Sequence, residues 1–61
     1  MLFRSPLGGS GRLYWLLDGV QVGVTDSGEP FSYRFEHPGQ HELTVLDAQA
    51  NYAGVEVELI D

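Results

Sequence analysis

The chain has 61 residues, no cysteine and a formal net charge of −6, because nine acidic residues face three arginines and no lysine. A chain of this length forms one small domain that buries only about 60% of its unfolded surface, so its stability is marginal. Neither a disulfide nor a thiolate zinc site can reinforce it. Nucleic acids and anionic membranes attract clustered cations, so we expect neither as a partner. No apolar run approaches the roughly 20 residues of a membrane span.

The chain opens with the segment MLFRSPLGGSG, a short apolar start followed by a linker rich in proline, glycine and serine. It has one arginine and a very short apolar stretch, so it does not resemble a signal peptide. We divide the chain into this N-terminal segment, residues 1–11, and a β module, residues 12–61.

Residues 13–25 have the pattern of a β-hairpin. Asp18 and Gly19 lie between two apolar runs, which is typical of a type I′ turn. A two-residue turn fixes the register and places apolar residues opposite each other on one face. The predicted pairs are Leu17 with Val20, Trp15 with Val22 and Leu13 with Val24 on that face, and Leu16 with Gln21 and Tyr14 with Gly23 on the other.

Three further strands are predicted. The segment 31–36 alternates, with Phe31, Tyr33 and Phe35 on one side. Leu43 and Val45 mark a strand that ends near Asp47. After a turn over residues 47–51, the segment 52–60 forms a last strand, with inward residues Val55, Val57 and Leu59. No stretch has helical periodicity, so we predict an all-β fold of about five strands.

The turn at Pro38 and Gly39 indicates how these strands are arranged. A plain two-residue hairpin would place Phe35 opposite Glu42, an apolar face against a polar one, and its type II turn would splay the strands. Either a bulge is present or the two strands lie in different sheets. We favour the second option, the crossover of a Greek-key sandwich.

Several motifs resemble a known family. The run Trp15-Leu16-Leu17-Asp18-Gly19 resembles strand C of immunoglobulin-like domains, and residues 38–45 resemble the entry to strand F, with His41 at the corner tyrosine position and Leu43 at that of the second cysteine. In order and spacing, LYWLLDG, PGQHELTVLDAQ and the closing strand are similar to the C-terminal immunoglobulin-like domain of 1C-type bifunctional penicillin-binding proteins. The resemblance covers residues 13–60.

The sequence departs from this family in two places. In the family, the turn after the strand-F-like segment reads Asp-x-x-Gly, whereas here Ala50 stands three residues after Asp47. We therefore expect Asn51 to take the left-handed position. The family domain also begins with two more strands, for which only residues 1–12 remain. A sandwich truncated in this way leaves the edge of the segment 31–36 open, unless the N-terminal segment or another chain covers it.

The resemblance implies a periplasmic, non-catalytic accessory module that docks or positions a peptidoglycan synthase. The partner is then a protein of the cell envelope, the rest of the synthase chain, or a second copy in a homodimer paired through the open edge. The candidate contact residues are Tyr14, Leu16 and Gln21 on the hairpin and Tyr33 and Arg34 on the edge. A second hypothesis is carbohydrate binding, with glycan strands of peptidoglycan stacked on Tyr14.

Catalytic and metal-binding roles are disfavoured. The serine chemistry of penicillin-binding enzymes requires two lysine-containing motifs. Asp18 and Asp47 have local reasons to occupy turns, and Glu56 and Glu58 lie outward on the last strand. His37 and His41 lack a third ligand nearby in the sequence, and we expect the His41 ring to bond backbone near the corner. Trp15 is expected in the core. We therefore expect no catalytic residue, no metal and no cofactor.

Overall fold

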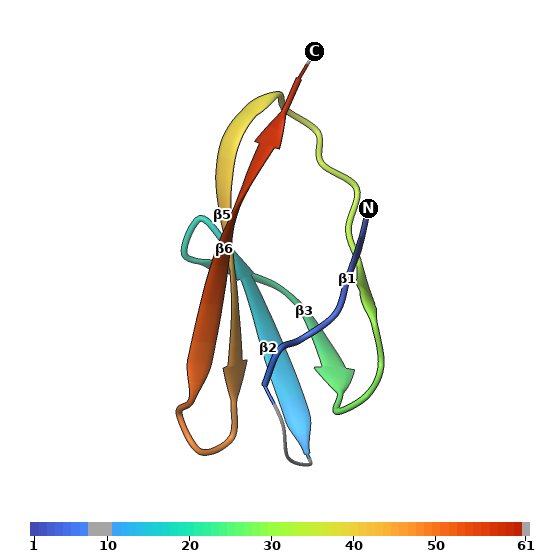
Figure 1. The fold of residues 1–61 in the computed structure, drawn as a ribbon, viewed down its shortest axis with the longest axis vertical. Helices are drawn as coiled ribbons and strands as arrows, with labels where there is room; N and C mark the ends of the chain where they lie inside the picture. The colour runs from blue at the N-terminus through green and yellow to red at the C-terminus, as the bar shows by residue number, and fades with distance from the viewer. Residues whose placement is uncertain (8–10, 61) are drawn as a thin grey trace.

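The computed structural model describes residues 1–7 and 11–60, and its regular elements are six β-strands. They are β1 (Leu2–Phe3), β2 (Arg12–Leu17), β3 (Val20–Asp26), β4 (Phe31–Ser32), β5 (Gly39–Asp47) and β6 (Tyr52–Leu59). The larger sheet has the antiparallel order β3-β2-β5-β6, and the smaller sheet pairs β1 with β4 (Figure 1). The predicted all-β sandwich is confirmed. No helix able to cross a membrane occurs among these residues.

The core lies between the two sheets. Its buried residues are Leu13, Trp15, Phe31, Leu43 and Val45. Trp15, with 2% of its surface exposed, stacks on Phe31 with ring centroids 4.9 Å apart and planes 10° apart. Because Trp15 belongs to β2 and Phe31 to β4, this contact joins the sheets. The prediction that Trp15 is a core residue is confirmed.

The crossover between sheets is also confirmed, since β4 and β5 lie in different sheets. The predicted strand 31–36 is shorter than expected, with regular pairing assigned only at Phe31–Ser32. Its alternation survives nevertheless, because Phe31, Tyr33 and Phe35 form a continuous series of ring contacts. The strand is short because its partner, β1, has only two residues.

The N-terminal segment covers the edge of residues 31–36, which is open in the truncated sandwich predicted from the sequence. Leu2 pairs with Ser32 and Phe3 with Phe31. The amide of Tyr33 donates to the Met1 carbonyl at 3.0 Å, and the Met1 ammonium donates to the Tyr33 carbonyl at 2.9 Å. Of the two alternatives for this edge, the structure therefore has the N-terminal segment of the same chain. The middle of the predicted linker, residues 8–10, lies outside the described residues, as does residue 61.

The type I′ turn is confirmed, with φ of 50° at Asp18 and 87° at Gly19. The predicted pairs of Leu17 with Val20 and of Leu16 with Gln21 are also confirmed, but the register predicted from Trp15 onward is wrong. It shifts between Leu16 and Trp15, so Trp15 lies opposite Gly23 rather than Val22. The reason is the Phe31 ring, since a Cβ at position 23 would overlap it. The same shift brings Thr25 to the indole, whose Nε1–H donates to the Thr25 hydroxyl at 2.9 Å. The bulge thus fits the hairpin to the aromatic stack.

The turn after β5 also differs from expectation. Ala50, not Asn51, takes the left-handed conformation, with φ of 65°. The Asp47 carboxylate accepts hydrogen bonds from the Gln49 amide and from both the backbone and the side-chain amide of Asn51, at 2.8–3.0 Å. These bonds hold Asn51 in place, so the positive φ falls on Ala50. The Asn51 contacts also lower the pKa of Asp47.

The close approach of Phe31 to Gly23 predicts the effect of a single methyl group. We expect Gly23→Ala to destabilise the domain by about 2 kcal/mol, because overpacking displaces the ring that stacks on Trp15. In a Phe31→Leu background the loss is expected to shrink. Denaturant unfolding measures both.

The matched control is Gly54→Ala in β6, where the new Cβ meets only ordinary contacts with Thr44 and Leu43. This substitution should be neutral or slightly stabilising. Equal losses for the two alanine variants would refute the packing explanation.

Candidate binding surfaces

The outer face of the larger sheet, turned away from the smaller one, carries an apolar row across all four strands. The register aligns Val24 with Tyr14, Tyr14 with Leu46, and Leu46 with Tyr52. We call these four residues the outer row. Tyr52 is 73% exposed and Val24 45% exposed, whereas Tyr14 and Leu46 are half-buried. The row has an aromatic ring on β2 and another on β6.

Three of the predicted contact residues lie at this surface. Tyr14 belongs to the outer row, and Leu16 lies opposite Gln21 in the adjacent cross-strand pair. Val24 was predicted on the inner face opposite Leu13, and the bulge turns it outward instead. Leu46 and Tyr52 were not singled out from the sequence. The alternation along their strands places both outward, but only the observed register aligns them with Tyr14.

The other two predicted residues lie elsewhere. Tyr33 is half-buried between Phe31 and Phe35, and both its backbone groups are bonded to Met1. Arg34 is exposed beside it. The five predicted residues therefore do not form one surface, and strand addition at Tyr33 is blocked by the chain's own N-terminus.

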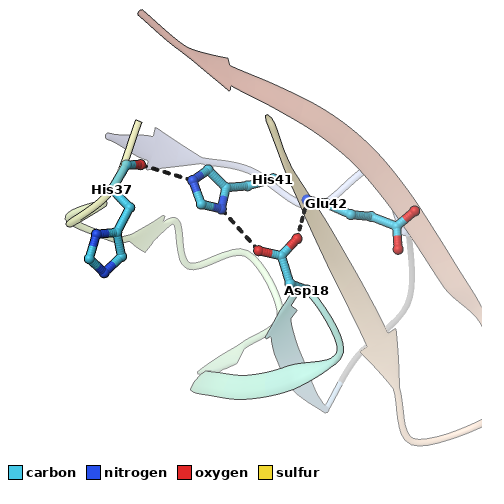
Figure 2. A network of polar contacts seen from close by, with 4 residues as sticks. All are labelled: Asp18, His37, His41 and Glu42. Atoms are coloured by element: carbon cyan, nitrogen blue, oxygen red, sulfur yellow. Dashed lines mark hydrogen bonds and ion pairs between the residues drawn. The ribbon is translucent and has the colours of Figure 1, made fainter. Parts of the chain in front are cut away.

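A polar network joins the hairpin turn to the start of β5. Asp18 accepts the amide of Glu42 at 2.8 Å through one carboxylate oxygen and contacts Nδ1 of His41 at 2.9 Å through the other. Figure 2 shows the His41 ring between Asp18 and the carbonyl of His37, which lies 2.9 Å from Nε2. The predicted bond from His41 to nearby backbone is confirmed.

Both neighbours of the His41 ring are hydrogen-bond acceptors, so only the imidazolium can donate to the two together. The Asp18 hydrogen bond, followed by that of the His37 carbonyl, accordingly raises the pKa of His41. The Glu42 amide, followed by His41, lowers the pKa of Asp18. This network is a structural clamp whose strength depends on charge. Within the described part of the chain, no three His, Cys, Asp or Glu residues gather as a metal site would require.

The clamp predicts how stability depends on pH. Because the folded pKa of His41 is raised, its contribution is complete below about pH 6.5 and is lost as the pH rises through the folded value. The Asp18 contribution is present above about pH 3.8 and is lost as the pH falls through its lowered folded value. The melting temperature should therefore fall between about pH 6 and about pH 8.

Thermal unfolding followed by circular dichroism measures this decline, and His41→Phe should flatten it. His37→Gln is the matched control and should retain the decline, because the contact uses the backbone carbonyl of His37. A decline of wild-type size in His41→Phe would show that another group is responsible.

The sequence matches the Penicillin-Binding Protein C-terminus Family over residues 3–57. This match begins in β1 and ends within β6, so it includes the hairpin, the aromatic stack and the clamp. Comparisons with curated proteins and with solved structures give no significant match. Since the family match spans most of the chain, the chain belongs to the penicillin-binding protein C-terminus family.

Proposed function

We propose that this chain is a non-catalytic accessory module of a periplasmic peptidoglycan synthase of the 1C type, and that it docks through the outer row. The observation that carries the proposal is the apolar, partly aromatic row that crosses all four strands on the outer sheet face. Exposed apolar residues that form one contiguous patch mark interaction sites in soluble proteins. Tyrosine is also among the residues enriched at the centres of protein interfaces.

The chemistry of the chain supports a non-catalytic role. Penicillin-binding enzymes acylate a serine with the help of lysine-containing motifs, and this chain has no lysine. Two of the carboxylates that a glycosidase mechanism could use are already engaged in hydrogen bonds: Asp18 with His41 and Glu42 of β5, and Asp47 within its own turn. The partner we propose is a protein of the cell envelope or the catalytic region of the synthase itself.

A second candidate function is binding of glycan strands. Tyr14 and Tyr52 lie on the same face, two strands apart, which corresponds to roughly 10 Å. Two tyrosine rings at this spacing offer a platform for sugar rings. Trp15 offers none, because Phe31 covers its face and 2% of its surface is exposed.

Binding assays on the purified chain separate the two functions. For docking, we expect Tyr52→Ala to weaken binding to the purified catalytic region of a 1C-type synthase about tenfold or more, as at interface hot spots. Val20→Ala is the control, since Val20 is exposed at the end of the hairpin and lies outside the outer row. Titration calorimetry or surface plasmon resonance gives both affinities.

Co-sedimentation with purified peptidoglycan tests the glycan alternative. Binding to peptidoglycan that Tyr14→Ala and Tyr52→Ala abolish, together with no binding to the synthase, would replace docking by glycan recognition. Binding to the synthase that both tyrosine variants leave intact would contradict the assignment of the outer row.

A further inference from the structure

Strand β6 lies at one edge of the larger sheet, and no described strand pairs with its outer side. It pairs with β5 over eight consecutive residues without a bulge. It also contains no proline and no lysine, two common means of protecting an edge strand. The opposite edge strand, β3, is interrupted by the bulge. Of the two edges of this sheet, β6 is therefore the one suited to accept another strand.

The hydrogen bonds of β5 show which groups of β6 face outward. The Glu42 carbonyl accepts from Asp18 on the β2 side, and the Asp47 amide donates to Asn51 on the β6 side. Because bonding direction alternates along a strand, the odd residues of β5 bond to odd residues of β6. The even residues of β6 consequently direct their N–H and C=O groups toward the free edge. They are Tyr52, Gly54, Glu56 and Glu58.

The inner face beside this edge is incompletely covered. Val55 was predicted to point inward, and it lies on that face, but 51% of its surface is exposed. Figure 1 shows β1 and the green β4 segment on the β3 side of the larger sheet, away from β6. A groove of about 350 Å³ runs between Leu2, Phe3 and Pro6 and the residues Ala53 and Val55. The buried Trp15 also lines this groove.

The outer face beside the same edge is acidic. Glu56 lies opposite Glu42, and Glu58 follows on the same side of β6. The three arginines of the chain, Arg4, Arg12 and Arg34, lie outside β5 and β6. Like charges opposite each other destabilise a sheet, and opposite charges stabilise it. A cationic neighbour at this edge would therefore relieve existing repulsion, whereas a second copy would add a further net charge of −6.

We propose that the β6 edge binds an extended segment of a partner protein in which apolar and basic residues alternate. Its backbone pairs with the even residues of β6, its apolar side chains enter the groove beside Val55, and its lysines or arginines lie over Glu56 and Glu58. Only Tyr52 belongs both to this edge and to the outer row, whereas Gly54, Glu56, Glu58 and the groove lie outside that row. The inference therefore does not depend on the docking proposed above.

Amide hydrogen exchange measured by NMR tests the edge directly. In the free protein, the amides of Gly54, Glu56 and Glu58 should exchange faster than those of Val55 and Val57, which bond to β5. The probe is a capped synthetic peptide that alternates valine and lysine over the length of β6. It should slow exchange selectively at the even residues. Equal slowing at the amides of β3, or no slowing at β6, overturns the proposal.

Two control peptides test the chemistry of the occupant. A valine–glutamate peptide of the same length should bind at least tenfold more weakly, and a valine–lysine peptide with a central proline should not protect the edge. Equal binding of the glutamate peptide would remove the electrostatic argument. Self-association that protects the same amides in the absence of peptide would identify a second copy as the occupant and overturn the proposal.

Variants of exposed residues complete the test. Glu56→Lys should weaken binding of the valine–lysine peptide about fivefold or more, because it replaces an attractive cross-strand pair by a repulsive one. Glu36→Lys is the control, since it changes the net charge equally at an exposed site outside both sheets. An equal loss of affinity for the valine–lysine peptide in the two variants would show that only the net charge matters, and it would refute recognition at β6.

Discussion

The stack of Phe31 on Trp15 joins the two sheets and also sets the register of the hairpin beneath it. The Phe31 ring occupies the space that a side chain at position 23 would need, so the hairpin bulges to bring Gly23 under it. The same shift places the Thr25 hydroxyl at the indole nitrogen, which would otherwise be a buried donor without a partner. One aromatic contact therefore determines the packing, the hydrogen bonding and the strand register.

A domain this small needs stabilising contacts beyond those of its hydrophobic core, and the described residues make such contacts. The N-terminal segment closes the open edge at Tyr33 through two backbone bonds. The Asp18–His41 clamp holds the hairpin turn against β5. The Asp47 carboxylate organises the turn between β5 and β6. Each device uses hydrogen bonds between segments distant in sequence or within a tight turn, in place of the disulfides that the chain lacks.

Local chemistry made much of the fold predictable. The Asp18-Gly19 turn, the alternation of Phe31, Tyr33 and Phe35, and the crossover at Pro38 follow from short-range rules. The contact of His41 with backbone was instead implied by the resemblance of its position to the corner tyrosine of immunoglobulin-like domains. The bulge did not follow from short-range rules, because its cause is a ring from another sheet. Val24 therefore moved from the predicted inner face to the outer row. Tyr14 and Leu16 were found from the sequence as candidate contacts, because both lie on the outer face of a hairpin with a predictable turn. The alignment of Leu46 and Tyr52 with Tyr14 was not found, because it depends on the pairing of strands distant in sequence. The left-handed Ala50 depends on how Asp47 holds Asn51, which spacing alone does not reveal.

The central claim is that Phe31 lies on Trp15 and over Gly23. Proton NMR tests it most directly, through nuclear Overhauser contacts between the two rings and through the ring-current shift of the Gly23 Hα protons. The account predicts contacts between the Trp15 indole and the Phe31 ring, with at least one Gly23 Hα displaced strongly upfield. Random-coil shifts at Gly23 and an indole without contacts to Phe31 would contradict it.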